Sequence, residues 1–260
     1  NMTMIKIDNL DIEALKVYTS LTESQLFSRN LFIAESKNVI VRAIQNGYEP
    51  VSLLIEDKEI ESDDGKEIFD CIGDIDIYYG TKEVLSQLTG YNLTCGFLCC
   101  FKRKEIQSVN DLIKAAKRIV ILENVTNSMN VGSIFRNAAA FGFDCVLLTE
   151  DSADPLYRRS IRVSMGNVFN IKYGFIEDIH TVKQYGFKTV GMALRKNTID
   201  IDDPSLKKEE KLAIVLGCEG YGLKDHTIDD CDYVVKIPMY NNVDSLNVSS
   251  ASAIALWELS

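Results

Sequence analysis

The chain has 260 residues, 46% of them hydrophobic and 25% charged, which is enough for one large globular domain or two smaller ones. Its formal net charge of −10 disfavours broad, non-specific adhesion to nucleic acid or anionic membrane, although a local basic patch is compatible with it. No apolar run approaches the length of a membrane span, and no signal peptide is expected.

The seven cysteines are odd in number and contain no CxxC pair, and the two histidines, His180 and His226, are isolated. A structural zinc site needs four ligands at close spacing, so no metal is expected. Three of the cysteines lie in an apolar segment around Cys95–Cys100 that is typical of a buried strand. Reduced thiols without an export signal favour a cytoplasmic location.

Residues 12–103 mix helical and strand patterns and predict a small α/β domain. An apolar run leads into a helical pattern that stops at Asn46-Gly47, a typical C-cap. Strands are expected at 51–55, at 75–79 and around Cys95, with a charged surface loop at 56–66 and a helix at 81–88 capped by Thr81. A linker at 104–116 is expected to end this domain.

From Lys117 onward, strands and helices alternate regularly. Several strand segments are apolar on both faces, which favours a parallel sheet covered by helices on both sides. Strands are expected at 118–124, 144–148, 188–194, 212–216 and 233–237, and helices at 131–141, 156–165, 223–230 and in a final segment that Ser245 caps.

Three loops at the carboxyl ends of these strands are chemically unusual, and this is where parallel sheets bind ligands. The first, at 124–137, carries several amides and Arg136, which needs an anionic partner if it is buried and is otherwise a surface residue. The second, at 216–223, has the glycine spacing G-x-x-G-x-G, which does not match the dinucleotide-binding pattern. Its Glu219 either caps the following helix or is functional.

The third loop, at 237–250, joins a strand end at Pro238 to the final helix. Asn247 is expected in the first turn of that helix, beside its exposed N–H groups. The arrangement suits a pocket for a polar small molecule. An ordinary buried helix with a capping serine remains the alternative.

In this order, the three loops resemble the motifs of the SpoU (TrmH) family of RNA ribose 2′-O-methyltransferases, of the SPOUT class. The matching segments are Asn130-Val131-Gly132-Ser133-Ile134-Phe135-Arg136, Leu216-Gly217-Cys218-Glu219-Gly220-Tyr221-Gly222-Leu223 and Ile237-Pro238-Met239 through Ser245-Leu246-Asn247-Val248-Ser249, with Arg162-Val163-Ser164-Met165-Gly166 as a further similar segment. The resemblance covers residues 117–260. The first part is similar, less specifically, to the family's ribosomal-protein-like RNA-binding domain. Two positions depart from the pattern: Ser36, where glycine is frequent, and Cys218, where asparagine is common.

The resemblance implies a parallel-sheet domain with a deep trefoil knot, an exception to the rule that chains are unknotted, and a homodimer with the site near the subunit interface. It implies S-adenosylmethionine as cofactor, bound in the knot. The residues expected to bind the cofactor are Gly217, Ile237, Leu246, Met192, Ala193 and Met239.

The implied reaction moves a methyl group from a sulfonium to a ribose 2′-hydroxyl. Arg136 is the central catalytic residue by resemblance, and we expect it to act as a cation rather than as a base, because a guanidinium holds its proton strongly. The residues expected to position the reactants with it are Asn130, Glu219, Ser245 and Asn247. The expected RNA contacts are Arg158, Arg159, Arg162, Lys102 and Arg103, with solvated surface cations as the alternative.

Ribosomal RNA is favoured over transfer RNA as the target, because of the additional first domain. The alternative function is an RNA-binding ribosome-assembly factor with a catalytically weak domain of the same fold. A generic nucleotide binder is disfavoured by the glycine spacing.

Overall fold

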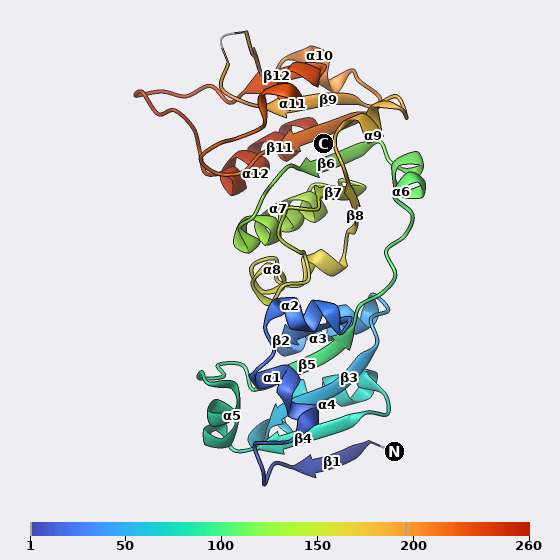
Figure 1. Ribbon diagram of the computed structural model, residues 1–260, viewed down its shortest axis with the longest axis vertical. Coiled ribbons are helices and arrows are strands. Elements are labelled where there is room, and N and C mark those ends of the chain that lie inside the picture. The colour runs from blue at the N-terminus through green and yellow to red at the C-terminus, as the bar shows by residue number, and fades with distance from the viewer. Residues whose placement is uncertain (1, 196) are drawn as a thin grey trace. The chain divides into compact units, whose positions relative to one another are not determined.

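The computed structural model describes residues 2–195 and 197–260, which form two compact units (Figure 1). The first unit runs to Glu105 and also contains Leu156–Phe169. The second unit consists of Ile106–Pro155 and Asn170–Ser260. Each unit has its own sheet. Among the described residues, no helix has the length and apolar character needed to cross a bilayer.

The first unit is built on a mixed five-stranded sheet of order β1-β4-β3-β5-β2. Strands β1, β4 and β3 are parallel, and β5 is antiparallel to both of its neighbours. The strands are β1 (Thr3–Lys6), β2 (Leu31–Glu35), β3 (Pro50–Glu56), β4 (Asp76–Gly80) and β5 (Phe97–Lys102). The helices are α1 (Lys16–Thr19), α2 (Glu23–Ser28), α3 (Lys37–Gln45), α4 (Asp63–Ile72), α5 (Lys82–Thr89) and, from the later segment, α8 (Arg158–Val163), with short 3₁₀ turns η1 (Glu13–Leu15), η2 (Asp57–Glu59) and η3 (Asn167–Phe169).

Side-chain caps determine where several helices of this unit begin. The Thr81 hydroxyl accepts a hydrogen bond from the Val84 N–H at 3.2 Å, so α5 begins where the sequence predicts. The expected charged loop at 56–66 is instead η2 followed by the first turns of α4, because the Ser62 hydroxyl accepts from the Gly65 N–H at 2.9 Å. Cys95 lies outside β5, which begins two residues later, after Gly96 at a φ of 70°.

The second unit contains a seven-stranded sheet of order β10-β12-β9-β11-β6-β7-β8, in which every pairing is parallel. The predicted parallel sheet is therefore correct. The strands are β6 (Arg118–Leu122), β7 (Cys145–Thr149), β8 (Lys172–Ile176), β9 (Lys188–Met192), β10 (Ile199–Asp200), β11 (Leu212–Leu216) and β12 (Tyr233–Lys236). The helices are α6 (Val109–Ala115), α7 (Ser128–Ala140), α9 (His180–Lys183), α10 (Pro204–Lys207), α11 (Asp225–Asp230) and α12 (Val248–Leu259).

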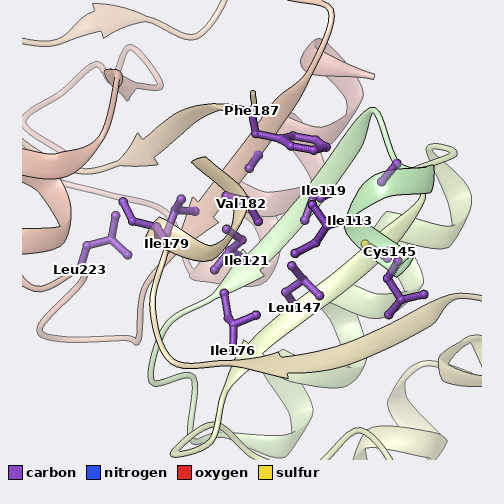
Figure 2. Close-up of a cluster of buried hydrophobic side chains, with 14 of the residues drawn as sticks. Ile113, Ile119, Ile121, Cys145, Leu147, Ile176, Ile179, Val182, Phe187 and Leu223 are labelled. Atoms are coloured by element: carbon purple, nitrogen blue, oxygen red, sulfur yellow. The ribbon is translucent and has the colours of Figure 1, made fainter. Parts of the chain in front are cut away.

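The core of the second unit lies on both faces of this sheet. Ile119 and Ile121 of β6 pack with side chains of β7, α6 and α9 in one apolar cluster (Figure 2). Val120 and Ile214 alternate with residues of that cluster and lie on the opposite face, where α7 contacts β7 and α12 contacts β11. All five residues of β11 are buried, as expected for a strand covered on both sides.

The compact units differ from the expected domain limits in two places. The expected linker 104–116 contains α6, whose Val109 packs so closely on β8 that a Cβ added at Gly174 would lie 2.7 Å from it. The segment Leu156–Phe169, expected within the methyltransferase domain, groups with the first unit. The physical reason is apolar packing. The centre of the Phe169 ring lies 5.7 Å from that of the Phe32 ring and 5.1 Å from that of the Tyr48 ring.

Candidate active site

A cavity of about 640 Å³ lies at the carboxyl ends of β9, β11 and β12 and is formed entirely within the second unit. Its wall comprises the end of β9 and the residues after it (Met192–Arg195), the end of β11 with the glycine-rich loop after it (Leu216–Leu223), the end of β12 with the segment after it (Val235, Lys236, Ile237, Met239 and Asp244–Val248) and single residues Asp225, Ile228 and Ala251. The carboxyl edge of a parallel sheet is the usual place for a ligand site. The volume lies within the common range for small-molecule pockets, about 300 to 1,000 Å³.

The glycine-rich loop folds back tightly on itself. A Cβ added at Gly217 would lie 2.4 Å from the Gly222 carbonyl carbon, so this position tolerates no side chain without a shift of the main chain. The Gly222 N–H donates to the Cys218 carbonyl at 3.0 Å, and Gly222 has a φ of 64°. The three glycines therefore bring main-chain N–H and C=O groups to the wall of the cavity.

A hydrogen bond joins the second and third predicted motifs. The Asn247 amide Nδ2 donates to Glu219 Oε1 at 2.9 Å. The Asn247 Oδ1 accepts from the Ser249 N–H at 2.8 Å, which makes Asn247 the N-cap of α12. Glu219 and Asn247 are thus held together at the cavity wall.

One expectation about a helix cap is wrong, and one of the two alternatives for Glu219 is excluded. Ser245 lines the cavity from the exposed loop before α12 and does not cap that helix, because Asn247, two residues later, supplies the capping oxygen. Glu219 does not cap α11, since its carboxylate accepts from Asn247 instead. The N-cap residue of α11 is Lys224, which makes no cap with its own side chain.

The six residues expected to bind the cofactor all lie in the wall of this one cavity, although they come from three separate segments. Met192 ends β9 and Ala193 follows it, Gly217 follows β11, and the other three follow β12. The set is Met192, Ala193, Gly217, Ile237, Met239 and Leu246.

Arg136 and Asn130 are not in the cavity wall of their own chain. Both belong to α7, where Asn130 is buried in the first turn and Arg136 is exposed. Within the described residues, the Arg136 guanidinium forms no hydrogen bond or ion pair. The next residue, Asn137, faces α12 and donates through Nδ2 to Ser249 O at 3.1 Å and Ser252 Oγ at 2.9 Å. Helix α7 therefore lies against α12, with Arg136 directed to the outside.

Glu123 is a buried carboxylate that the sequence analysis missed. It follows β6 and is 6% exposed. Its Oε2 accepts from the Lys224 N–H at 3.0 Å, and its Oε1 accepts from the Thr227 hydroxyl. Glu123 therefore caps α11 and holds one side of the cavity in place. The available signal was an acidic residue directly after the apolar run Ile119–Leu122.

The predicted RNA-contacting cations all lie in the first unit, but their surroundings differ. Lys102 pairs with Glu49 at 2.7 Å, and the Arg103 guanidinium lies 4.6 Å from the centre of the Phe27 ring. Arg158 stacks over Tyr91 and donates to its hydroxyl. Arg159 and Arg162, one turn apart on α8, are exposed and form no hydrogen bond or ion pair with another side chain of the described residues.

The fold and the site together define an α/β protein that binds a small ligand at the carboxyl edge of a parallel sheet. The model of the SpoU rRNA Methylase family matches residues 117–257. An uncharacterized tRNA/rRNA methyltransferase of Mycobacterium tuberculosis is 32% identical to the chain, with 88% of this chain and 80% of the relative covered. The chain therefore belongs to the SpoU family, and it is by class an RNA 2′-O-methyltransferase with S-adenosylmethionine as methyl donor.

Other relatives agree with this membership. The 23S rRNA (guanosine-2′-O-)-methyltransferase RlmB of Bordetella pertussis is 31% identical over 59% of this chain and 63% of its own length. An AdoMet-bound rRNA methyltransferase from Sinorhizobium meliloti superposes with a TM-score of 0.84 at 21% identity, over 98% of this chain and 97% of that one. The SpoU methyltransferase AviRb from Streptomyces viridochromogenes, in complex with AdoMet, gives 0.81 at 19% identity, over 95% and 97%. These solved structures share the fold of the whole chain.

Proposed function

We propose that this chain methylates a ribose 2′-hydroxyl of structured RNA, and that ribosomal RNA is its target in preference to transfer RNA. The observation that carries the proposal is the cavity at whose wall Glu219 and Asn247 are joined by a hydrogen bond. The relatives support the substrate class, because one is named a tRNA/rRNA methyltransferase and another a 23S rRNA methyltransferase.

The cavity suits S-adenosylmethionine in size and in chemistry. The close approach of Gly217 to Gly222 leaves main-chain groups facing the ligand, and these can pair with the edge of a purine. Ile237 and Leu246 supply apolar wall, which favours an adenosine group over a highly charged ligand. When bound, the cofactor supplies an activated methyl group, and the chain's own residues bind and orient it.

A ribose hydroxyl is a weak nucleophile until its developing negative charge is stabilised or its proton is removed. In our proposal Arg136 is the cation that fixes the RNA phosphate and stabilises this charge. Asn130, Glu219, Ser245 and Asn247 hold the ribose and the methyl donor in line. The exposed position of Arg136, unpaired among the described residues, leaves its guanidinium available for such a phosphate.

A homodimer would complete the site. Trp257 and Ile254 of α12 are 68% and 39% exposed, although the same helix buries Leu256 and Leu259. A helix that is apolar on all sides is normally buried on all sides. We therefore propose that α12 and the neighbouring α7 contact a second copy, and that Arg136 of one protomer serves the cavity of the other. We also propose, from the resemblance to the SpoU family, that the chain around the cavity forms a trefoil knot.

The first unit is proposed to bind RNA through Arg159 and Arg162. Both are exposed on α8 without a side-chain partner in the described residues, so their charges are available to phosphates.

The seven free thiols favour a reducing location, and we propose the cytoplasm.

The test is transfer of radiolabelled methyl from S-adenosylmethionine to purified ribosomal RNA and, separately, to transfer RNA. Alkaline hydrolysis then separates ribose from base methylation, because a 2′-O-methyl group blocks cleavage at its own phosphodiester bond. We expect alkali-resistant labelled dinucleotides from ribosomal RNA. Label in mononucleotides would contradict ribose methylation. Retained RNA binding without any binding of S-adenosylmethionine would instead support the assembly-factor function.

A further inference from the structure

Five charged residues line the cavity: Arg195, Glu219, Asp225, Lys236 and Asp244. Glu219 is already engaged by the Asn247 amide. Arg195 and Asp225 form an ion pair with each other, between the segment after β9 and the first residue of α11. The cavity wall therefore carries one cation and one anion in direct contact.

This ion pair is exposed and easily rearranged. The Arg195 and Asp225 side chains are 45% and 88% exposed. Such surface pairs stabilise the fold only slightly, since water screens both charges. Neither residue is needed to hold the loop in place, because the N-terminus of α11 is fixed by Glu123. Both groups can turn to a ligand at little cost to the fold.

S-adenosylmethionine has two chemically distinct ends, an adenosine and an amino acid zwitterion. We propose that Arg195 and Asp225 bind the amino acid end, with the Arg195 guanidinium on its carboxylate and the Asp225 carboxylate on its ammonium. This inference rests on the proposed cofactor site. A guanidinium matches a carboxylate with two parallel hydrogen bonds, and an adjacent carboxylate completes the match to a zwitterion. The ligand thus replaces each half of an existing ion pair with an equivalent partner.

Lys236 is the competing cation in the cavity wall. Its ammonium forms no ion pair among the described residues, although Asp200 stands opposite Lys236 on the neighbouring strand β10. A zwitterion needs both signs in one place, and the Arg195–Asp225 pair supplies them. Lys236 is therefore the matched control for the experiment.

The experiment measures binding of three ligands by calorimetry. S-adenosylhomocysteine has the complete amino acid end, decarboxylated S-adenosylmethionine keeps only its ammonium, and 5′-methylthioadenosine lacks that end altogether. For Arg195→Met we expect about tenfold weaker S-adenosylhomocysteine binding, equivalent to about 1.4 kcal/mol, and unchanged binding of the other two ligands. Asp225→Asn should weaken both ligands that carry the ammonium and leave 5′-methylthioadenosine unchanged.

Unchanged 5′-methylthioadenosine binding also serves as the test that each variant is folded. If Arg195→Met lost the same affinity for all three ligands, the assignment would be overturned. Unchanged affinity for all three would overturn it as well. If Lys236→Met no longer distinguished ligands with the carboxylate from those without it, and Arg195→Met still did, the carboxylate would be assigned to Lys236 instead. Failure of the unmodified protein to bind any adenosine ligand would instead count against the proposed function itself.

Discussion

Arg136 occupies an unusual position for a residue proposed to be catalytic. It is exposed on α7, outside the cavity of its own chain, while its neighbour Asn137 is tied to α12. Its backbone is therefore firmly placed, and its side chain extends from a rigid helix. A guanidinium in this position can bind a phosphate with two parallel, coplanar hydrogen bonds, a geometry that an ammonium does not offer.

The variant Arg136→Lys keeps the positive charge and loses the paired N–H donors of the guanidinium. We expect methyl transfer to fall by about 100-fold or more, the usual cost of removing one preorganised donor to a developing oxyanion, with S-adenosylmethionine affinity unchanged. Single-turnover kinetics and calorimetry measure the two quantities. Arg29→Lys, an exposed substitution in the first unit, is the matched control. Turnover close to that of the unmodified protein would remove Arg136 from the mechanism.

Single residues were only partly predictable from the sequence. The cofactor-binding set was chosen by resemblance, and its members share one cavity because parallel strands bring their carboxyl ends to one edge. The cap of α12 was misassigned, since Ser245 and Asn247 are both good capping residues and only the backbone path decides between them. Ser36, where glycine is frequent, adopts a φ of 79° that few residues other than glycine tolerate, and no local pattern predicted this.

At the scale of elements, α8 presents two arginines on one exposed face. Arg159 and Arg162 are three residues apart in the helix, so their side chains are neighbours. Arg158 differs from them, because it is held by Tyr91. Of the three arginines of α8 that were expected to contact RNA, two therefore have no side-chain partner among the described residues.

The double variant Arg159→Glu/Arg162→Glu should weaken RNA binding at least tenfold and flatten its salt dependence. Each lost phosphate contact lowers the slope of log affinity against log salt by about 0.7 to 0.9. Filter binding at several salt concentrations measures this change. The control is Lys6→Glu/Lys82→Glu, which reverses two exposed charges elsewhere in the same unit. An equal effect of both double variants would show that only net charge matters.

Fully apolar segments gave the most accurate element predictions. The limits of β11 match the prediction, because all five of its residues are buried and apolar. Strand β8 was missed, since Lys172 and Gly174 interrupt its apolar pattern. Helix α6 was missed inside the expected linker, where its surroundings are polar and only Leu112 and Ile113 are buried.

At the scale of the whole molecule, the exposed side of α12 is the feature on which the proposed dimer rests. The Trp257 ring is 68% exposed, and its contact with a ring of its own chain is the edge contact with Phe141 at 5.8 Å. A large aromatic residue in this position is typical of an interface anchor.

Parallel-sheet architecture was predictable from apolar strands, whereas the grouping of α8 with the first unit depends on tertiary packing of Phe169.

Trp257→Glu should convert the proposed dimer to monomers, because it places a charge in the apolar contact. Sedimentation velocity at micromolar concentration measures the mass directly. Trp257→Phe keeps an apolar ring and should remain dimeric. Methyl transfer should fall together with dimerisation if Arg136 serves the other protomer. A monomeric unmodified protein, or a dimeric Trp257→Glu variant, would contradict the interface.

The order of the strands has a consequence for how the second unit folds. Strand β6 pairs with β11, so Arg118 must meet Leu212 across a long stretch of chain. Contacts between segments so far apart carry a large entropic cost of loop closure, and chains dominated by them fold slowly. Glu123, which follows β6, bonds to the N-terminus of α11 beside the cavity, so the cavity wall is complete only after β6 has joined β11. A cofactor that binds only the finished cavity then raises the melting temperature by mass action, without accelerating folding.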